Sequence, residues 1–301
     1  MNWLLIAFLA PLLWAVSTFI DKVLLSKYFK GKVGALIIYS CLIGLPIFII
    51  IFLFKPEVIN INLVTALLVI LNSTLFIIYL FPYLYALNQD DTSAVVPIFR
   101  IVPVFTFILA FFILGEKLTL LQILAGILII SGAIGMSSNF SGKGIHIKKK
   151  VLGLMILASL MVAVNSVLFK FFAIELDFWT VSFWQYFGFF IFGLILLIFV
   201  KKYRVDFIES YRENKLSIVG LNLFNEVINI IAIIISTYAT LLAPVALVGL
   251  VNGFQPFFVF LLGTLMTLMV PNLIKEDLSR KKLIQKIFFI IILFIGGALL
   301  V

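Results

Sequence analysis

The sequence predicts an all-α polytopic membrane protein with ten transmembrane helices, arranged as two inverted five-helix repeats. Of the 301 residues, 64% are hydrophobic and 12% are charged, and the mean hydropathy is +1.28. A soluble domain carries about 45–50% apolar and about 25% charged residues, so an ordinary globular core is excluded. The apolar residues form runs of about 20, the length that crosses a bilayer as a helix. The second half of the chain also repeats the pattern of the first.

Composition excludes several other classes of protein. A net charge of +9 would fit nucleic-acid binding if it formed a basic face on a soluble fold, but here Lys and Arg lie in short segments between apolar runs. One cysteine, Cys41, and one histidine, His146, cannot supply a disulfide framework or a zinc site. The sequence also lacks an ATP-binding motif of the G-x-x-x-x-G-K-[ST] kind. We therefore expect no nucleic-acid partner, no cofactor, no metal and no catalytic residues.

Hydropathy and helix-breaking residues divide the first half into five helices. Runs such as Leu121 to Ile134, which are mostly apolar and do not alternate with polar residues, favour helices over strands. The first run lacks a basic n-region and a small-residue cleavage site, so we expect it to remain as a helix. In chain order the helices are expected at 3–25, 34–54, 63–87, 92–114 and 119–137, and the polar or basic segments 26–33, 55–62, 88–91 and 115–118 separate them.

The hydrophilic segment 138–150 ends the first half, and five more apolar runs follow it. Charged segments at 201–215 and 271–282 mark two of the boundaries between these runs. Because proline lacks the backbone N–H of a helix interior, we expect kinks at prolines within or beside the spans. The second-half helices are expected at 151–172, 179–200, 216–238, 242–270 and 283–300, and the kinks at Pro82, Pro97, Pro103, Pro244 and Pro256.

The two halves align with each other at a constant offset of 153 residues, without a gap, between 63–112 and 216–265. The matches other than generic apolar residues include Asn72 with Asn225, Pro103 with Pro256, and Tyr85-Ala86 with Tyr238-Ala239. Because each repeat has an odd number of helices, the second must enter the membrane from the opposite side. Inverted repeats are typical of alternating-access transporters. We predict a first repeat over 1–137, a basic connecting loop over 138–150 and a second repeat over 151–301.

The segment AVVPIFRIVPVFTFILAFFILGEKLTLLQILAGILIISGAIG, residues 94–135, resembles the signature of EamA-type members of the drug/metabolite transporter superfamily. It has a proline in the fourth helix, then Gly-Glu-Lys-Leu-Thr, then a fifth helix with spaced glycines. The second half echoes it with QPFFVFLLG and KEDLSRKKLIQK, although it has extra residues around 266–272 and lacks the glycine before Glu276. The resemblance implies a ten-helix secondary transporter of small metabolites, amino acids or drugs, often an exporter, in a bacterial or archaeal cell membrane.

Two considerations disagree on the orientation of the chain. The side of the membrane that holds the N-terminus has only Lys55 and Lys117, whereas the other side collects most of the remaining basic residues. The positive-inside rule therefore places both termini outside the cell. The resemblance implies that both termini are cytoplasmic. A reporter that is active only in the cytoplasm, fused after Val301, would decide between them.

Few ionisable residues lie within the predicted spans, and each is costly there. In the eighth helix, Asn222, Asn225, Glu226 and Asn229 follow the spacing i, i+3, i+4 and i+7, which places them on one face. At 1.5 Å per residue, Glu226 and Arg100 lie about 15 Å and about 12 Å from the same side. Three interpretations stay open for them: a structural ion pair, a proton-coupling carboxylate at Glu226, or an anion-binding guanidinium at Arg100.

The first helix has a second polar face with the same spacing, made by Trp14, Ser17, Thr18 and Asp21. Lys22 and its repeat mate Lys170 are candidate gate residues, or they extend to the nearest interface as lysines near helix ends do. The other residues expected to line a central substrate cavity are Asn72, Tyr79, Tyr83, Asn165, Ser166, Asn252 and Gln255.

These features predict a secondary active transporter, an exporter or exchanger, that moves a small zwitterionic, amphipathic or aromatic molecule by alternating access. Its expected partners are this small molecule, the lipid bilayer and protons, and it is expected to act as a monomer. A channel or a lipid-scramblase-like protein is the alternative. A membrane-embedded enzyme is a weaker alternative, because the ionisable residues of the spans form no catalytic motif.

Overall fold

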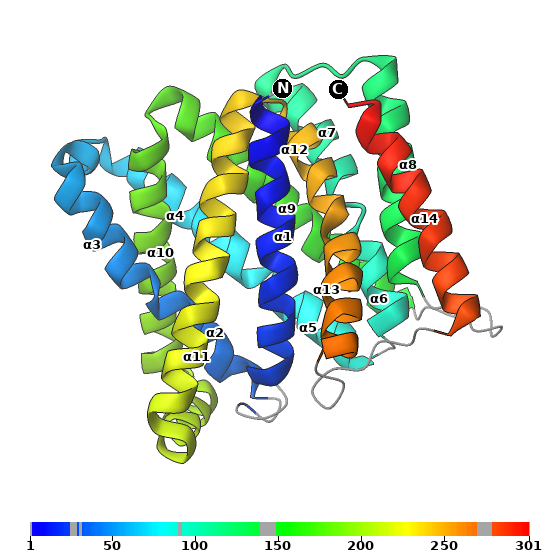
Figure 1. Ribbon diagram of the computed structural model, residues 1–301. Helices are drawn as coiled ribbons and strands as arrows, with labels where there is room; N and C mark the ends of the chain where they lie inside the picture. Colours follow the sequence, from blue (N-terminus) through cyan, green and yellow to red (C-terminus); the bar gives the residue numbers. More distant parts are fainter. Residues whose placement is uncertain are drawn as a thin grey trace. The chain divides into compact units, whose positions relative to one another are not determined.

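The computed structural model describes residues 2–24, 29, 32–89, 92–138, 149–269 and 279–300, and these residues form helices without any strand. Figure 1 shows the helices in chain order. Their bounds are α1 Asn2–Val23, α2 Val33–Leu42, α3 Gly44–Phe54, η2 Pro56–Ile59, α4 Leu63–Ile78, α5 Leu80–Gln89, α6 Thr92–Phe99, α7 Val102–Leu114, α8 Leu120–Ser137, α9 Lys149–Glu175, α10 Phe178–Phe199, α11 Lys201–Leu242, α12 Val245–Val251, η3 Asn252–Phe254, α13 Gln255–Met269 and α14 Arg280–Ala298.

Prolines explain why three of the predicted helices are divided. α2 ends at Leu42, α4 at Ile78 and α6 at Phe99. Each of these residues lies four positions before a proline, the position whose carbonyl the proline cannot bond and against which its ring clashes. The three prolines are Pro46, Pro82 and Pro103. In the second half, η3 interrupts the predicted helix 242–270 just before Pro256.

The charged segment 201–215, expected to be a loop, is helical instead. It forms the first part of α11, which runs for 42 residues. The helical spacing of Tyr203 and Phe207 gives this part an apolar face, and Phe207 packs on Tyr39 of α2 with ring centroids 4.5 Å apart. Lys32 and Glu209 add an ion pair of 2.8 Å. Packing against α2 therefore stabilises this segment as a helix, although its charge indicated a loop.

Nine helices of the described chain are long and apolar enough to span a membrane. They cover Trp3–Asp21, Val33–Phe54, Leu63–Tyr83, Val96–Leu114, Leu120–Ser137, Lys149–Glu175, Phe178–Phe199, Gly220–Leu242 and Val245–Met269. α14 corresponds to the tenth predicted helix, but its first turn carries Arg280, Lys281 and Lys282. Nine of the ten spans thus have support from the structure, and the tenth stays a prediction.

The chain forms two compact units, and each takes segments from both halves of the sequence. Unit 1 comprises Met1–Val16, Tyr79–Val167 and Ala232–Val301, and unit 2 comprises Ser17–Ile78 and Leu168–Ile231. Two of the boundaries, before Tyr79 and before Ala232, are separated by the 153-residue offset of the sequence repeat. The units are therefore not the predicted halves 1–137 and 151–301, whose boundaries and inverted relation stay predictions. Most of the predicted loop 138–150 lies outside the described residues.

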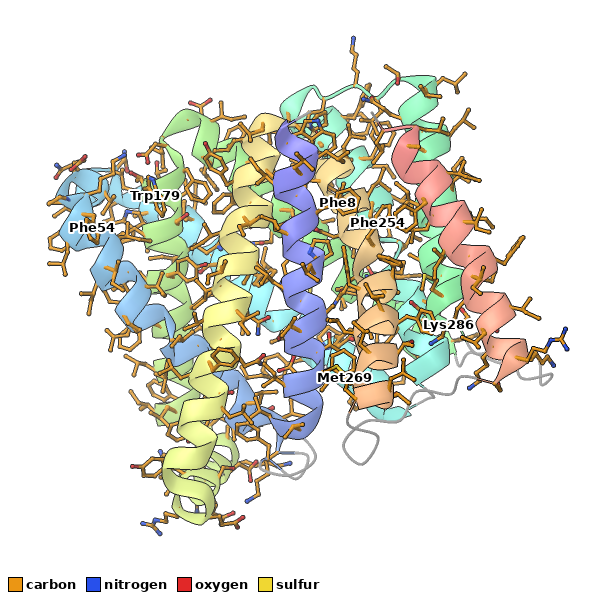
Figure 2. The ribbon with its side chains drawn as sticks, in the orientation of Figure 1. Phe8, Phe54, Trp179, Phe254, Met269 and Lys286 are labelled. Atoms are coloured by element: carbon orange, nitrogen blue, oxygen red, sulfur yellow. The ribbon has the colours of Figure 1, made fainter. Side chains whose placement is uncertain are left out.

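In unit 1, glycines let α8 and α14 approach closely, and the two helices lie side by side in Figure 1. A Cβ added at Gly132 would lie 2.8 Å from the Cβ of Leu293, so only glycine fits there. The aromatic core of this unit includes Phe8 and Phe254, whose rings meet edge to face at a centroid distance of 4.7 Å. Phe8 comes from α1 and Phe254 from η3, just before α13, and both are labelled in Figure 2.

In unit 2, α10 is the central helix and packs against α2, α3 and α4. Asp177 caps its start by accepting hydrogen bonds from the backbone N–H groups of Trp179 and Thr180, at 2.8 and 3.1 Å. Lys55 pairs with the same carboxylate at 2.9 Å. Although partial desolvation acts in the opposite direction, these hydrogen bonds, with one from the Thr180 hydroxyl, hold the pKa of Asp177 below its usual value.

Candidate functional site

Five polar residues of unit 2, which we call the acidic cluster, join α1, α2 and α11: Ser17, Asp21, Ser40, Asn225 and Glu226. Asn225 donates its Nδ2–H to Asp21 Oδ1 at 2.6 Å. The Ser17 hydroxyl lies 3.4 Å from Asp21 Oδ2. The Ser40 hydroxyl donates to Glu226 Oε1. The carboxyl groups of α1 and α11 thus accept hydrogen bonds from donors on three helices, α1, α2 and α11.

Three of the five residues of the acidic cluster are buried, and Asp21 and Ser40 are half-buried. Glu226 is 7% exposed, Ser17 is 2% exposed and Asn225 is fully buried. A carboxylate inside a membrane span costs at least about 2.5–3.5 kcal/mol, and hydrogen bonds from hydroxyl and amide groups offset part of that cost. The chain therefore retains a costly pair of acids and surrounds it with donors, which is the arrangement expected of a functional group.

Three polar atoms beside the acidic cluster have no hydrogen-bond partner among the described residues. They are Asn222 Oδ1, Asn225 Oδ1 and the Tyr186 hydroxyl, and all three residues are at least 97% buried. Tyr186 and Cys41 both lie within electrostatic range of the Glu226 carboxyl. Buried polar atoms are usually paired with protein groups or ordered water, so these three atoms are positions where water or a bound molecule can form hydrogen bonds.

Helical periodicity explains how two of these elements present their residues. Asn222, Asn225 and Glu226 lie three and four positions apart in α11, so one face carries all three. Ser17 and Asp21 are four positions apart in α1, which brings the hydroxyl to the carboxylate of the next turn. Ser17 and Asp21 of the stripe predicted on α1 lie in the same unit as the stripe predicted on α11, whereas Trp14 belongs to unit 1 and Thr18 is exposed.

Arg100 of unit 1 lies in the break between α6, which ends at Phe99, and α7, which begins at Val102. Phe99, its neighbour in the chain, packs on Tyr79 and Tyr83 with ring centroids 5.8 and 5.2 Å apart. The Nε atom of Arg100 is buried and makes no hydrogen bond within the described chain. A guanidinium at a helix break is suited to an anionic group. Arg100 and Glu226 belong to different units, so the predicted ion pair between them stays a prediction.

The structure places the predicted cavity residues in two sets. Trp14, Tyr79, Tyr83, Arg100, Asn165, Ser166, Asn252 and Gln255 belong to unit 1, and Ser17, Thr18, Asp21, Asn72, Lys170, Asn222, Asn225, Glu226 and Asn229 to unit 2. Thr18 is exposed, and the Ser166 hydroxyl bonds the Val162 carbonyl of its own helix. Asn252 donates to Ser236 at 3.3 Å. The side chain of Lys22, a candidate gate, lies outside the described residues.

Sequence reasoning missed Ser40 and Tyr186. Tyr186 follows Ser182 and Gln185 at the helical spacing i, i+3 and i+4, a stripe that was overlooked, whereas Ser40 belongs to no such stripe. One weak signal was available: Tyr39, Ser40 and Cys41 are three consecutive residues with polar atoms in the otherwise apolar segment 33–54. Within the described chain, no three His, Cys, Asp or Glu side chains lie together in a way that could hold a metal ion.

Residues 1–138 match the model of the EamA-like transporter family, which is part of the drug/metabolite transporter superfamily. The similarity to this family thus covers the first 138 of the 301 residues. The match indicates a membrane transporter of the drug/metabolite type, and with the apolar helices it makes the protein a multi-pass integral membrane protein. One crystal structure, described only as that of a protein, is similar over 99% of this chain and 96% of its own, with a TM-score of 0.68 and 16% identity. At that identity the similarity shows the fold alone. No curated protein matches the sequence.

Proposed function

We propose that the protein is a secondary active transporter that exports or exchanges a small molecule and couples this movement to protons through Glu226. The observation that carries the proposal is the buried Glu226 carboxyl, hydrogen-bonded to Ser40 of another helix and adjacent to the Asp21–Asn225 pair. The EamA-like match supports transport as the class of function.

A carboxyl in this position can change the bonding between helices when it gains or loses a proton. The ionised form accepts the hydrogen bond of Ser40, whereas the protonated form has a donor of its own and fewer acceptor sites. Asp21 carries a second carboxyl in the same cluster, so the two acids disfavour simultaneous ionisation. One proton exchanged at the acidic cluster would therefore alter contacts among α1, α2 and α11, which is the local event that proton-coupled alternating access requires.

The proposal is tested with the purified full-length protein in proteoliposomes that contain a pH-sensitive dye. Proteinogenic amino acids, primary amines and aromatic drugs are added one at a time under an imposed pH gradient. We expect at least one compound to cause a saturable, proton-linked signal and to show counterflow. Glu226→Gln should lower that signal at least about tenfold, which corresponds to about 1.4 kcal/mol. Glu57→Gln, which removes an exposed carboxylate, is the matched control.

Two outcomes would contradict the proposal. Flux that rises linearly with concentration and shows no counterflow would indicate a channel or scramblase. A pH-driven signal that Glu226→Gln leaves intact would exclude proton coupling through this residue.

A further inference from the structure

The acidic cluster offers more hydrogen-bond acceptors than donors. Asp21 and Glu226 contribute two carboxyl oxygens each, and the described donors to them are the hydroxyls of Ser17 and Ser40 and the amide of Asn225. The adjoining face of α11 adds two further acceptors, the side-chain oxygens of Asn222 and Asn225, which have no partner among the described residues, whereas the unpaired Tyr186 hydroxyl of α10 can also donate.

Asn225 is oriented by its neighbour. A carboxylate accepts hydrogen bonds and cannot donate them, so the amide presents Nδ2 to Asp21 and keeps Oδ1 as a free acceptor. This Oδ1 is buried without a donor, and so is the Oδ1 of Asn222 one turn earlier on the same face. The two side chains are 0% and 3% exposed. The Asn225 oxygen is left unpaired because its amide donates to Asp21, whereas no printed contact ties the Asn222 oxygen to a carboxyl group, and neither oxygen accepts a hydrogen bond within the described chain.

From the geometry of Asp21, Glu226 and the two unpaired amide oxygens, we infer that the acidic cluster binds the protonated amino group of the transported molecule. The inference rests on the proposed transport function and names the substrate class as primary amines. An ammonium group has three N–H donors, a positive charge and no acceptor, so it complements oxygens and carboxylates together. A proton alone would neutralise one acid and leave both amide oxygens unpaired. A carboxylate or phosphate would add acceptors and negative charge where both are already in excess.

Exchange of an amine for a proton follows from the same arrangement. With the amine absent, a proton on one carboxyl reduces the repulsion between the two acids. With the ammonium bound, its charge takes over that role and the proton can leave. The bound cation and the proton therefore compete for the acidic cluster, which is the condition for exchange of one against the other.

The test measures thermal unfolding of the detergent-purified full-length protein at pH 7. The probes are primary amines from methylamine to phenethylamine, each compared with the alcohol of the same carbon skeleton, and phenylacetate as the anionic probe. We expect at least one amine to stabilise the protein saturably while its alcohol and the anion do not. Asn222→Leu and Asp21→Asn should each raise the apparent Kd of that amine about tenfold or more. Thr264→Val is the control, because its hydroxyl is equally buried without a partner but belongs to unit 1.

Several results would overturn the inference: an alcohol that stabilises as well as its amine, no amine-specific stabilisation in the series, an unchanged Kd in both variants, or Na⁺ as the only stabilising cation. If Asn222→Leu does not fold, Asp21→Asn alone decides. Failure of the inference and failure of the proposed function are distinguishable. Proton-linked flux without amine-specific stabilisation contradicts only the amine site, whereas amine binding without saturable flux contradicts only the transport function.

Discussion

The equivalent positions of α4 and α11 carry the same asparagine but serve different purposes. Asn72 and Asn225 are repeat mates, and both are buried. The residue after each differs: α4 has Ser73, whereas α11 has Glu226. The Ser73 hydroxyl donates to the Ile70 carbonyl of its own helix at 2.7 Å, so it needs no hydrogen-bond acceptor from another helix.

The surroundings of the two residues explain the difference. α10 approaches α4 so closely that a Cβ at Gly188 would lie 2.0 Å from Ser73 Oγ. Glu226, in contrast, accepts a hydrogen bond from α2 and lies within electrostatic range of Asp21. One repeat uses the position for close packing and the other for a carboxyl group. The repeat thus supplies a common scaffold, and the proposed chemistry is concentrated in the α11 copy.

The largest effect on stability is expected on the α4 side. Gly188→Ala places a methyl group against Ser73, and overpacking of this kind costs about 1–3 kcal/mol. Ser73→Ala in the same chain should restore part of the loss, because it removes Oγ but leaves the Ser73 Cβ 3.2 Å away. The apparent Tm in detergent measures both changes. The comparison fails if Gly188→Ala is as stable as the parent, or if Glu226→Gln lowers the Tm more than Gly188→Ala does.

A smaller effect is expected at the start of α10, the helix that packs on Ser73. Asp177→Ala removes the N-cap and the Lys55 pair, which should cost about 1 kcal/mol. The pKa of Asp177 is lowered in the folded protein, so its stabilisation is present at neutral pH and is lost as pH falls below about 4. Tm curves from pH 7 to pH 3 for the parent and for Asp177→Asn should therefore converge at the acidic end. Curves that stay parallel would contradict this role of the charge.

The smallest effect is expected between α2 and α11, away from the acidic cluster. The hydrogen bond to Glu209 raises the pKa of Lys32. The stabilisation is then fully present below the ordinary lysine pKa and is lost only as pH rises beyond it, so no change is expected between pH 5 and pH 9. Because both side chains are partly exposed, Lys32→Ala should cost about 0–1 kcal/mol and depend on salt. A large Tm loss that salt leaves unchanged would show that α2 and α11 depend on this pair.

Much of the helical pattern was predictable, and the errors have physical causes. Runs of about 20 apolar residues predict spans directly. The predicted prolines Pro82 and Pro103 follow two of the divisions, whereas the division before Pro46 was not predicted and Pro97 lies inside α6. The segment 201–215 was predicted wrongly as loop, because charge was taken as the signal and the helical spacing of Tyr203 and Phe207 was not. Periodicity predicts polar stripes on α1 and α11, whereas Ser40 has no periodic partner and the spacing of Ser182, Gln185 and Tyr186 in α10 was overlooked.

The sequence by itself determined that the chain is a helical membrane protein, where most helices begin and end, and which faces of α1 and α11 are polar. These are local properties, since hydropathy, helix breaks and 3.6-residue spacing depend on near neighbours. Only the tertiary structure decided that Asp21 meets Asn225, 204 residues away, and that Ser40 meets Glu226, 186 residues away. It also decided that each compact unit draws on both halves. Such pairings depend on packing between distant helices, which no local pattern encodes.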